Sequence, residues 1–452
     1  MTDSDLSVYE KSRLENIRKN KEQLEKLGLG TFSLPDITNT AGDNGKPAGK
    51  KAKRIRKEVD TPVAAREGTR LSRRVRGEDP NGIKLEHQQP GDNVDIKAEQ
   101  RRYDEPISGT IKMESLDFFP SVKDELEEEP IVLDSKYSEL TNPIPEGTLK
   151  IVSNMIYSVE MHPSTTKLVA AVGDKRGNLA FWDVSDTITN CINQDFEPIV
   201  TAFKPHSQAI SKIMYGVTDS NKIYMSSYDT TMRCMDIVAG EITQAMIHPH
   251  KEMITHFDLD SNGCCWLSTG DGDAGFFDPR SPKPIKYYEL SAKKLNTIHV
   301  NPVKPMFAVC GLDRTIKIFD VRKLEAEPLF ELEHDKSVNS AYWNMNGDTI
   351  VSVSFDDTVA VWTDFAIPIC KRIKHDNNTG RWVQKFKAVM KRNDNVFCVG
   401  NKKRHVDVYS TEAKLIGKLS SNMTSIPAIN VFHPTVNTIV SGNSSGRMTV
   451  WI

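Results

Sequence analysis

Long apolar segments and paired cysteines are both missing from this chain of 452 residues. No run of 18 uncharged apolar residues occurs and the first residues form no apolar signal segment, so we expect neither a membrane protein nor a secreted one. The seven cysteines include no C-x-x-C pair, which argues against a disulfide framework and a structural zinc site and favours a reducing compartment. The patterns G-x-x-x-x-G-K-S/T and H-E-x-x-H are also absent, and we expect no enzyme, no metal and no cofactor.

The first third of the chain is poor in aromatic and β-branched residues. Such a composition buries too little apolar surface to offset chain entropy, so residues 1–147 are predicted to form a mostly disordered arm. Charge is segregated within it: the basic segment 46–76 holds 12 Lys and Arg against 3 acidic residues, and the acidic segment 104–146 holds 3 against 12. The near-neutral total of the chain therefore conceals two oppositely charged stretches.

One short helix is predicted in the arm, at about 8–27. Leu14, Ile17, Leu24 and Leu27 recur at helical spacing, and Gly28 is placed to end the helix. Its apolar stripe is narrow, so two interpretations stay open: a solvated helix that frays, or a helix that orders in the groove of a partner.

From about residue 148 the sequence repeats. Short runs rich in strand-forming residues are separated by residues typical of turns, and each repeat has a large apolar residue near the end of its last such run. Successive residues of this kind are 53, 42, 42, 43, 47 and 42 residues apart. The seven closing residues are Trp182, Met235, Phe277, Phe319, Trp362, Tyr409 and Trp451. Seven units of this length predict an all-β fold, a seven-bladed WD-repeat β-propeller over 148–452.

The last unit has only three strands before the chain reaches Ile452. A missing outer strand would leave an exposed sheet edge. The run TLKIV, Thr148 to Val152, precedes the first inner strand, and we predict that it pairs as the fourth strand of the last blade.

Basic residues recur in two classes of loop that open on one face of a propeller, those between second and third strands and those between blades. Base-independent binding to DNA phosphates needs such a cluster, although ordinary solvated loop charge would look the same in a sequence. The candidates for double-stranded DNA binding on this face are Lys175, Arg176, Lys293, Lys294, Arg381, Trp382, Lys402, Lys403 and Arg404.

Trp382 is the aromatic member of this set. It follows Arg381 in HDNNTGRWVQKFKAV, and an aromatic beside an arginine on a positive surface suits base stacking or wedging into a distorted duplex. The alternative is a Trp that packs between blades.

Acidic residues in the same turns have a structural explanation. Asp229, Asp313 and Asp356 are expected to accept hydrogen bonds within their own turns, and His206 and His334 to complete these networks. We do not expect them to be catalytic.

Two segments of sixteen residues, CWLSTGDGDAGFFDPR and FAVCGLDRTIKIFDVR, each end in an acid, one residue and an arginine. Asp278 with Arg280, and Asp320 with Arg322, follow third strands and so belong to the opposite face. The pattern resembles the box by which WD-repeat substrate receptors dock on the adaptor of a cullin-RING ubiquitin ligase. Many WD repeats carry it for packing alone.

Several segments together resemble one family. The segments YEKSRLENIRKNKEQLEKLGL, TRLSRRVRG, GDKRGNLAFWDV, LDRTIKIFDVR and above all HDNNTGRW are similar to the changed-mutation-rate / WD-repeat-protein-76 family, relatives of the small subunit of the damaged-DNA-binding complex. The resemblance implies nuclear DNA binding with a preference for damaged duplex, association with chromatin and replication-stress machinery, and docking on a cullin-RING ligase.

By position, the resemblance places Lys175 and Lys293 or Lys294 where the damage-binding relative has phosphate-contacting lysines. It places 379–382 at the relative's wedge hairpin. The aromatic-amide-histidine wedge of the relative is absent here, so the resemblance carries duplex binding over to this chain but not lesion flipping.

The arm carries two further motifs. The run GKKAKRIRKE has the density of a nuclear-import signal, with Lys50, Lys51, Lys53, Arg54, Arg56 and Lys57, or is a solubilising charge run. Four tetrapeptides of the form apolar-Lys-x-Glu resemble SUMO acceptor sites, at Lys84, Lys97, Lys112 and Lys123.

These observations predict a monomeric, nuclear, chromatin-associated protein of the DNA-damage and replication-stress response. Its expected partners are double-stranded DNA and a cullin-RING ligase adaptor, with histones or other chromatin proteins as further candidates. The alternative is a protein-interaction scaffold or histone-tail reader that does not bind DNA itself, because propellers host unrelated functions.

Overall fold

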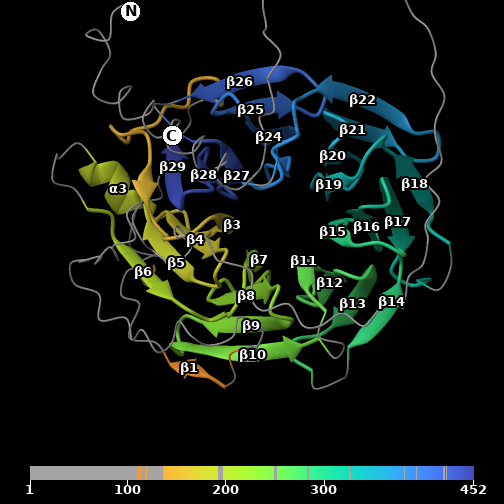
Figure 1. Ribbon diagram of the computed structural model, residues 1–452, viewed down its shortest axis with the longest axis horizontal. Helices are drawn as coiled ribbons and strands as arrows, with labels where there is room; N and C mark the ends of the chain where they lie inside the picture. Colours follow the sequence, from red (N-terminus) through yellow and green to blue (C-terminus); the bar gives the residue numbers. More distant parts are fainter. Residues whose placement is uncertain are drawn as a thin grey trace, which may run out of the picture. The chain divides into compact units, whose positions relative to one another are not determined.

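The computed structural model describes residues 107, 109–112, 119, 136–191, 197–248, 252–281, 285–324, 327–380, 382–392, 394–420, 423 and 425–452. The chain divides into two compact units, 1–92 and 93–452, and all described residues belong to the second. Seven antiparallel sheets surround a central axis in this unit (Figure 1). The predicted seven-bladed propeller is therefore confirmed.

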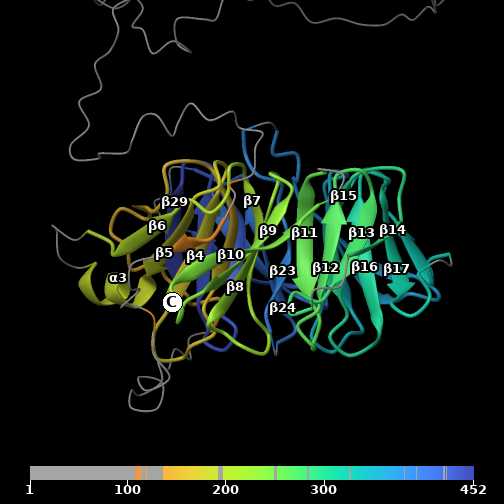
Figure 2. The same cartoon turned by 90° about the horizontal axis from the view of Figure 1, so that it is seen from below.

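Each blade runs from an inner to an outer strand, and the turned view shows the blades side by side with loops on both faces (Figure 2). The first three blades consist of β3 (Ile156–Met161), β4 (Val169–Asp174), β5 (Leu179–Asp183) and β6 (Val200–Phe203); β7 (Ile210–Tyr215), β8 (Lys222–Ser227), β9 (Thr231–Asp236) and β10 (Glu241–Ile247); and β11 (Ile254–Leu259), β12 (Cys265–Thr269), β13 (Asp273–Phe277) and β14 (Lys286–Glu289). The next three consist of β15 (Leu295–Val300), β16 (Met306–Gly311), β17 (Thr315–Asp320) and β18 (Phe330–Glu333); β19 (Val338–Trp343), β20 (Ile350–Ser354), β21 (Thr358–Asp364) and β22 (Ile369–Lys374); and β23 (Val389–Met390), β24 (Val396–Asn401), β25 (His405–Ser410) and β26 (Leu415–Ser420). The seventh consists of β27 (Pro427–Phe432), β28 (Ile439–Asn443), β29 (Arg447–Trp451) and β2 (Leu149–Lys150).

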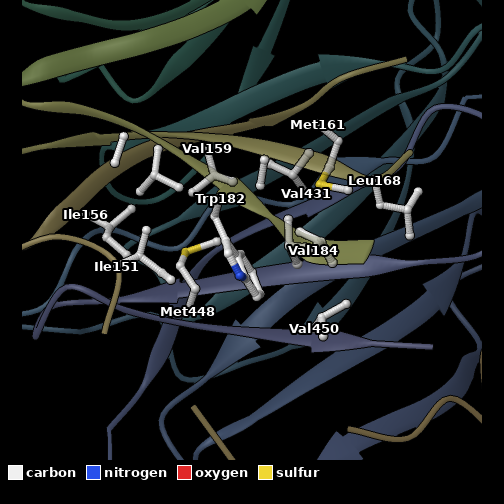
Figure 3. Packing of buried hydrophobic residues seen from close by; sticks show 14 of the residues in the cluster. Ile151, Ile156, Val159, Met161, Leu168, Trp182, Val184, Val431, Met448 and Val450 are labelled. Carbon is white, nitrogen blue, oxygen red and sulfur yellow. The ribbon is translucent and has the colours of Figure 1, made fainter. Parts of the chain in front are cut away.

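The seven closing residues of the repeats all lie in third strands, and all are buried. Trp182 is one of them. It belongs to a cluster with Ile156, Met448 and Val450 that joins the first blade to the seventh (Figure 3). Large apolar side chains at this position fill the space between neighbouring sheets, which explains why they mark the repeat in the sequence.

The ring closes through β2. Leu149 pairs with Met448 and Lys150 with Arg447 on β29, and the backbone of Thr141 exchanges hydrogen bonds of 2.8 and 2.9 Å with Ile452. The prediction that Thr148 to Val152 supplies the outer strand of the last blade is confirmed. This pairing covers the edge that β29 would otherwise expose.

The longest repeat spacing has a structural cause. Helix α3 (Val184–Asn190) lies between β5 and β6, and Asp183 caps it by accepting a hydrogen bond from the backbone N–H of Asp186. The indole of Trp182 donates to the hydroxyl of Thr187, 2.8 Å away. This helix was not predicted.

Part of the arm contacts the propeller. Strand β1 (Ile111–Lys112) adds a fifth strand to the second blade beside β10, and Arg233 donates hydrogen bonds to the carbonyls of Ile107 and Gly109. Phe119 is buried, with its ring centroid 5.0 Å from that of Phe181.

Residues 136–147 also pack on the ring, where Tyr137 and Leu140 join a core cluster with Phe432. Ordered chain thus lies on both sides of the predicted domain border at 147. The predicted helix at about 8–27 and the basic segment 46–76 lie outside the described residues. No helix among the described residues is long and apolar enough to cross a membrane.

Candidate nucleic-acid interface

The two predicted loop classes share one face of the ring. Backbone N–H groups join them: Lys175 donates to the carbonyl of Met155 at 2.8 Å, and Leu312 donates to that of Lys294 at 3.0 Å. His375 donates in the same way to the turn between β20 and β21. The two loop classes that carry the predicted basic positions are therefore adjacent in the structure.

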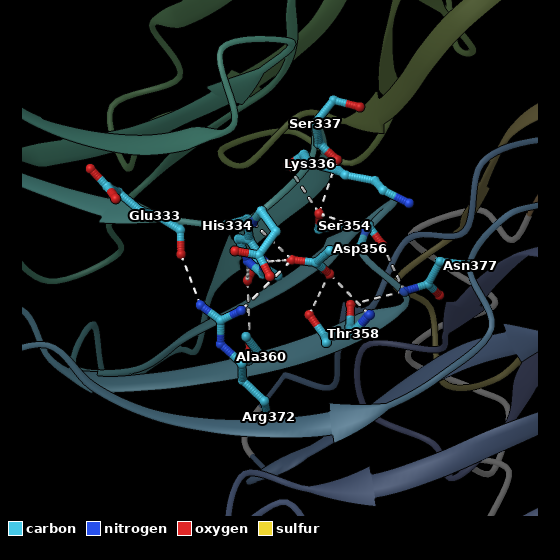
Figure 4. Close-up of polar contacts among 12 residues, drawn as sticks. Glu333, His334, Lys336, Ser337, Ser354, Asp356, Thr358, Ala360, Arg372 and Asn377 are labelled. Atoms are coloured by element: carbon cyan, nitrogen blue, oxygen red, sulfur yellow. Dashed lines mark hydrogen bonds and ion pairs between the residues drawn. The ribbon is translucent and has the colours of Figure 1, made fainter. Parts of the chain in front are cut away.

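The turn aspartates on this face have the structural role that was predicted. Asp356 lies 2.8 Å from Nδ1 of His334 and accepts hydrogen bonds from the backbone N–H and hydroxyl of Thr358 (Figure 4). Nε2 of His334 lies 2.9 Å from the hydroxyl of Ser352, which also accepts from the indole of Trp362. The chain of contacts ties a surface turn to the core of the fifth blade.

Asp229 repeats this arrangement in the second blade. Burial opposes its ionisation, but hydrogen bonds from His206 and Thr231 prevail and lower the pKa of Asp229 to about 2. Asp313 accepts from the hydroxyl of Ser291 at 3.1 Å and from the backbone of its own turn at Thr315. All three carboxylates are engaged in holding turns.

A pocket of about 340 Å³ lies at the centre of this face. Its lining comes from blades on opposite sides of the ring and includes three predicted residues, Lys175, Lys294 and Trp382. Lys294 is half-buried, with its ammonium 5.3 Å from the centre of the Tyr228 ring, and burial lowers the pKa of Lys294. The structure thus brings residues from three distant loops to one place.

Sequence reasoning missed two basic residues of this pocket, Lys385 and Lys387. They flank Phe386, which is fully buried in the core, so the two lysines point the other way, towards the pocket. Burial, with Lys212 and Lys385 nearby, lowers the pKa of Lys387 to about 8. The alternation of Lys385, Phe386 and Lys387 could have indicated that the two lysines face away from the core. The loop is long, however, so the start of the following inner strand could not be located from the sequence.

Trp382 lies at the rim of the pocket and is 72 % exposed. The interpretation that it packs between blades is therefore wrong. Its indole is accessible to a ligand on the same side as the lysines.

Five other predicted basic residues lie in loops of this face but do not line the pocket. Arg176, Lys293, Lys403 and Arg404 are exposed, and Lys402 forms a 2.7 Å ion pair with Asp376. Arg381 lies outside the described residues.

The opposite face carries the two acid-arginine pairs. Arg280 contacts Asp278 at 2.9 Å, and Arg322 contacts Asp320 at 2.7 Å. In each pair the arginine folds back onto the carboxylate two residues before it, on neighbouring third and fourth blades. The backbone of Val321 bonds to that of Pro305, in a loop between first and second strands, which sets these residues apart from the basic face.

The arm motifs are almost entirely outside the described residues. This applies to Lys84, Lys97 and Lys123, and to the predicted import signal at Lys50, Lys51, Lys53, Arg54, Arg56 and Lys57. Lys112 is described: it is exposed in β1, opposite Glu241.

One short pattern matches a hydrolase consensus. Residues 442–446, GNSSG, fit G-x-S-x-G, which in α/β-hydrolases lies on a sharp strand-to-helix turn. Here the pattern spans the turn between antiparallel β28 and β29, where the carboxamide of Asn443 accepts hydrogen bonds from the backbone of Ser445 and Arg447. The local structure is that of a propeller turn.

Comparisons with known proteins agree with this architecture. The family profile described as WD domain, G-beta repeat matches residues 283–320 and 326–363. The chain is 29% identical to DNA damage-binding protein CMR1 of Phaeosphaeria nodorum, over 99% of each chain. It is 30% identical to WD repeat-containing protein 76 of Xenopus laevis, over 99% of this chain and 80% of the relative. It is 28% identical to DNA damage-binding protein CMR1 of Kluyveromyces lactis, over 98% of this chain and 99% of the relative.

Proposed function

The chain belongs to the family of DNA damage-binding protein CMR1 and WD repeat-containing protein 76, and from this premise we propose that it binds double-stranded DNA through its basic face, with a preference for damaged duplex. The observation that carries the proposal is the convergence of Lys175, Lys294 and the exposed Trp382 on one pocket. The names of the relatives support DNA binding in general.

The chemistry of this face suits a nucleic acid. Lysines that neutralise phosphates release counterions, and this release gives affinity without sequence preference. An exposed indole among them can stack on an unpaired base, which damaged duplexes offer more readily than intact ones.

The test is a triple substitution of Lys175, Lys293 and Lys294 to Glu. Duplex affinity should fall at least about tenfold, and the slope of log K against log salt should flatten by about 0.9 for each phosphate that the variant no longer neutralises. Fluorescence anisotropy over a salt series measures both quantities.

The matched control changes Lys286, Lys371 and Lys418 to Glu. These lysines are exposed on outer strands, so the net charge changes by the same amount away from the basic face. Equal reductions in affinity in the two triple variants would show that the face has no special role.

We also propose that Asp278, Arg280, Asp320 and Arg322 dock on the adaptor of a cullin-RING ligase, so that the protein acts as a substrate receptor. Two arginines with the same fold-back geometry on neighbouring blades form a repeated, exposed motif. Changing Arg280 and Arg322 together to Ala should abolish recovery of the adaptor with the nuclease-treated protein, whereas Arg372→Ala should not. Adaptor recovery that is unchanged by the double substitution would leave the pairs a packing role only.

A nuclear, chromatin-associated location follows from the proposed DNA binding, and the arm supplies the expected import signal at 50–57. The acceptor-like lysines Lys84, Lys97, Lys112 and Lys123 are proposed as SUMO sites. If all four are changed to Arg and the ladder of conjugates in cells is unchanged, this part of the proposal fails.

A further inference from the structure

The central pocket of the basic face concentrates positive charge without compensation. Lys175, Lys294, Lys385 and Lys387 all line it, and no described lining residue is acidic. Within the described part of the chain, none of the four forms an ion pair. Cations gathered in a half-buried site repel one another. An anion that binds among them offsets this electrostatic repulsion, which destabilises the ligand-free site.

A second feature of the pocket points independently to a ligand. Asn339 lines it and is 2 % exposed, and neither its amide nitrogen nor its amide oxygen has a hydrogen-bond partner among the described residues. A buried amide without partners has given up its hydrogen bonds to water and gained none in return, which destabilises the ligand-free pocket. An anionic oxygen that enters the pocket would accept a hydrogen bond from the amide nitrogen of Asn339.

The size of the pocket limits what can enter. About 340 Å³ is at the lower end of the volumes that hold one small molecule. The side of a duplex is far too wide, and an internal phosphodiester carries one charge and is flanked by sugars on both sides. A phosphate at a terminus carries up to two charges and is attached on one side only.

We propose that this pocket is a binding site for a phosphomonoester, with Lys175, Lys294, Lys385 and Lys387 around its oxygens and Asn339 beneath them. Two sources offer this group: the phosphorylated end of a DNA strand and a free nucleotide. The proposal deepens the DNA-binding function and rests on it for the first source, in which Trp382 at the rim would stack on the terminal base.

Titration of the pocket supports an anionic ligand. The pKa of Lys387 near 8 means that its charge is lost as the pH rises through that value in the free protein. A bound dianion stabilises the ammonium, so affinity should fall as the pH rises through about 8.

The experiment compares matched probes on the full-length protein. Short duplexes of one sequence carry 5′-phosphate, 3′-phosphate or hydroxyl ends, and a covalently closed circular duplex provides DNA without ends. Inorganic phosphate and a nucleoside monophosphate are titrated by calorimetry. We expect a phosphorylated end to bind about tenfold more tightly than a hydroxyl end, and Lys387→Met and Asn339→Ala to abolish this difference.

Lys418→Met is the control, because Lys418 lies exposed on the outer strand β26. Lys387→Met removes a half-buried charge and keeps a side chain of similar length, so the fold should be retained. Circular dichroism and urea denaturation check this directly.

The outcomes separate the two proposals. If a nucleoside monophosphate binds as tightly as a phosphorylated strand, the phosphate group that the pocket recognises comes from a free nucleotide. If the phosphorylated strand binds much more tightly, the phosphate group comes from a DNA end. Binding of phosphate without binding of the circular duplex would overturn the proposed function but support the pocket. Equal affinities for all ends, with no heat from phosphate or nucleotide, would overturn the pocket.

Discussion

Single turn residues hold the faces of this propeller in place. Asp356 is the clearest example, because its carboxylate joins His334, Ser352 and Trp362 in one chain of hydrogen bonds. Such residues were recognised from the sequence because an aspartate before a threonine in a tight turn has few other uses.

Removal of Asp356 should therefore be costly. Asp356→Ala leaves His334 and two backbone donors without an acceptor in a buried site, and we expect a decrease of about 2 to 4 kcal/mol in the free energy of unfolding. Urea denaturation measures it. Asp335→Ala, in the exposed neighbouring position, should cost less than about 0.5 kcal/mol.

Two buried histidines should make stability depend on pH. Burial lowers the pKa of His162 and that of His433, each to about 4, and the positive charge of a neighbouring group adds to the effect in both cases. Because the unfolded chain binds the proton near pH 6.5 and the folded one only near pH 4, stability is full above 6.5 and is lost as the pH falls from 6.5 to 4.

Each histidine can contribute up to about 3 kcal/mol to this decrease. The replacement His433→Asn keeps a side-chain acceptor for the backbone N–H of Val436, which donates to His433 at 3.0 Å, but removes the titration. Denaturation at pH 7 and pH 5 should show a smaller difference for the variant than for the wild type. An identical difference in both proteins would mean that other groups control the acid sensitivity.

At the scale of elements, the strands that close the ring and extend a blade differ in how visible they are in the sequence. The outer strand of the last blade was predictable because three strands leave an open edge and TLKIV is the nearest apolar run. Strand β1 was not, because two residues in an acidic stretch carry no periodic signal. Helix α3 was missed for a similar reason: seven residues are too few to show a stripe, and the bond from Trp182 to Thr187 is tertiary.

The difference between these elements can be tested by truncation. A chain that starts at residue 107 keeps β1 and β2, whereas one that starts at 153 loses both and exposes the edge of β29. We expect the shorter chain to unfold at a lower temperature and to associate through its free edge. Thermal unfolding and light scattering after size-exclusion chromatography measure both effects; two monomers of equal stability would contradict the role given to β2.

The candidate site was predictable only in part. Lys175, Lys294 and Trp382 were found because the repeat assigns each loop to a face. Lys385 and Lys387 were not, because residues 375–388 have no counterpart in the other repeats and the register of the following inner strand could not be fixed. Asn339 carries no sequence signal, since only the structure reveals that its amide is unpaired.

At the scale of the whole molecule, the question is whether the propeller itself binds DNA or whether the arm is needed. The alternative function, a scaffold that reaches chromatin through its arm and partners, predicts that a chain starting at residue 107 no longer binds DNA. The function proposed here predicts that this chain keeps a salt-dependent affinity for duplex DNA, because the basic face is complete without the first 106 residues. An electrophoretic mobility shift series at about 50 to 200 mM salt decides between them.

The pairing of β2 with β29 has a consequence for biosynthesis. Leu149 leaves the ribosome about 300 residues before its partner Met448, so the seventh sheet cannot assemble until nearly all of the polypeptide has been translated. Throughout that interval the nascent chain presents unsatisfied backbone groups of β2 and the first blade's uncovered apolar side, which chaperones recognise. Folding of this protein should therefore depend on chaperones more strongly than its finished stability suggests.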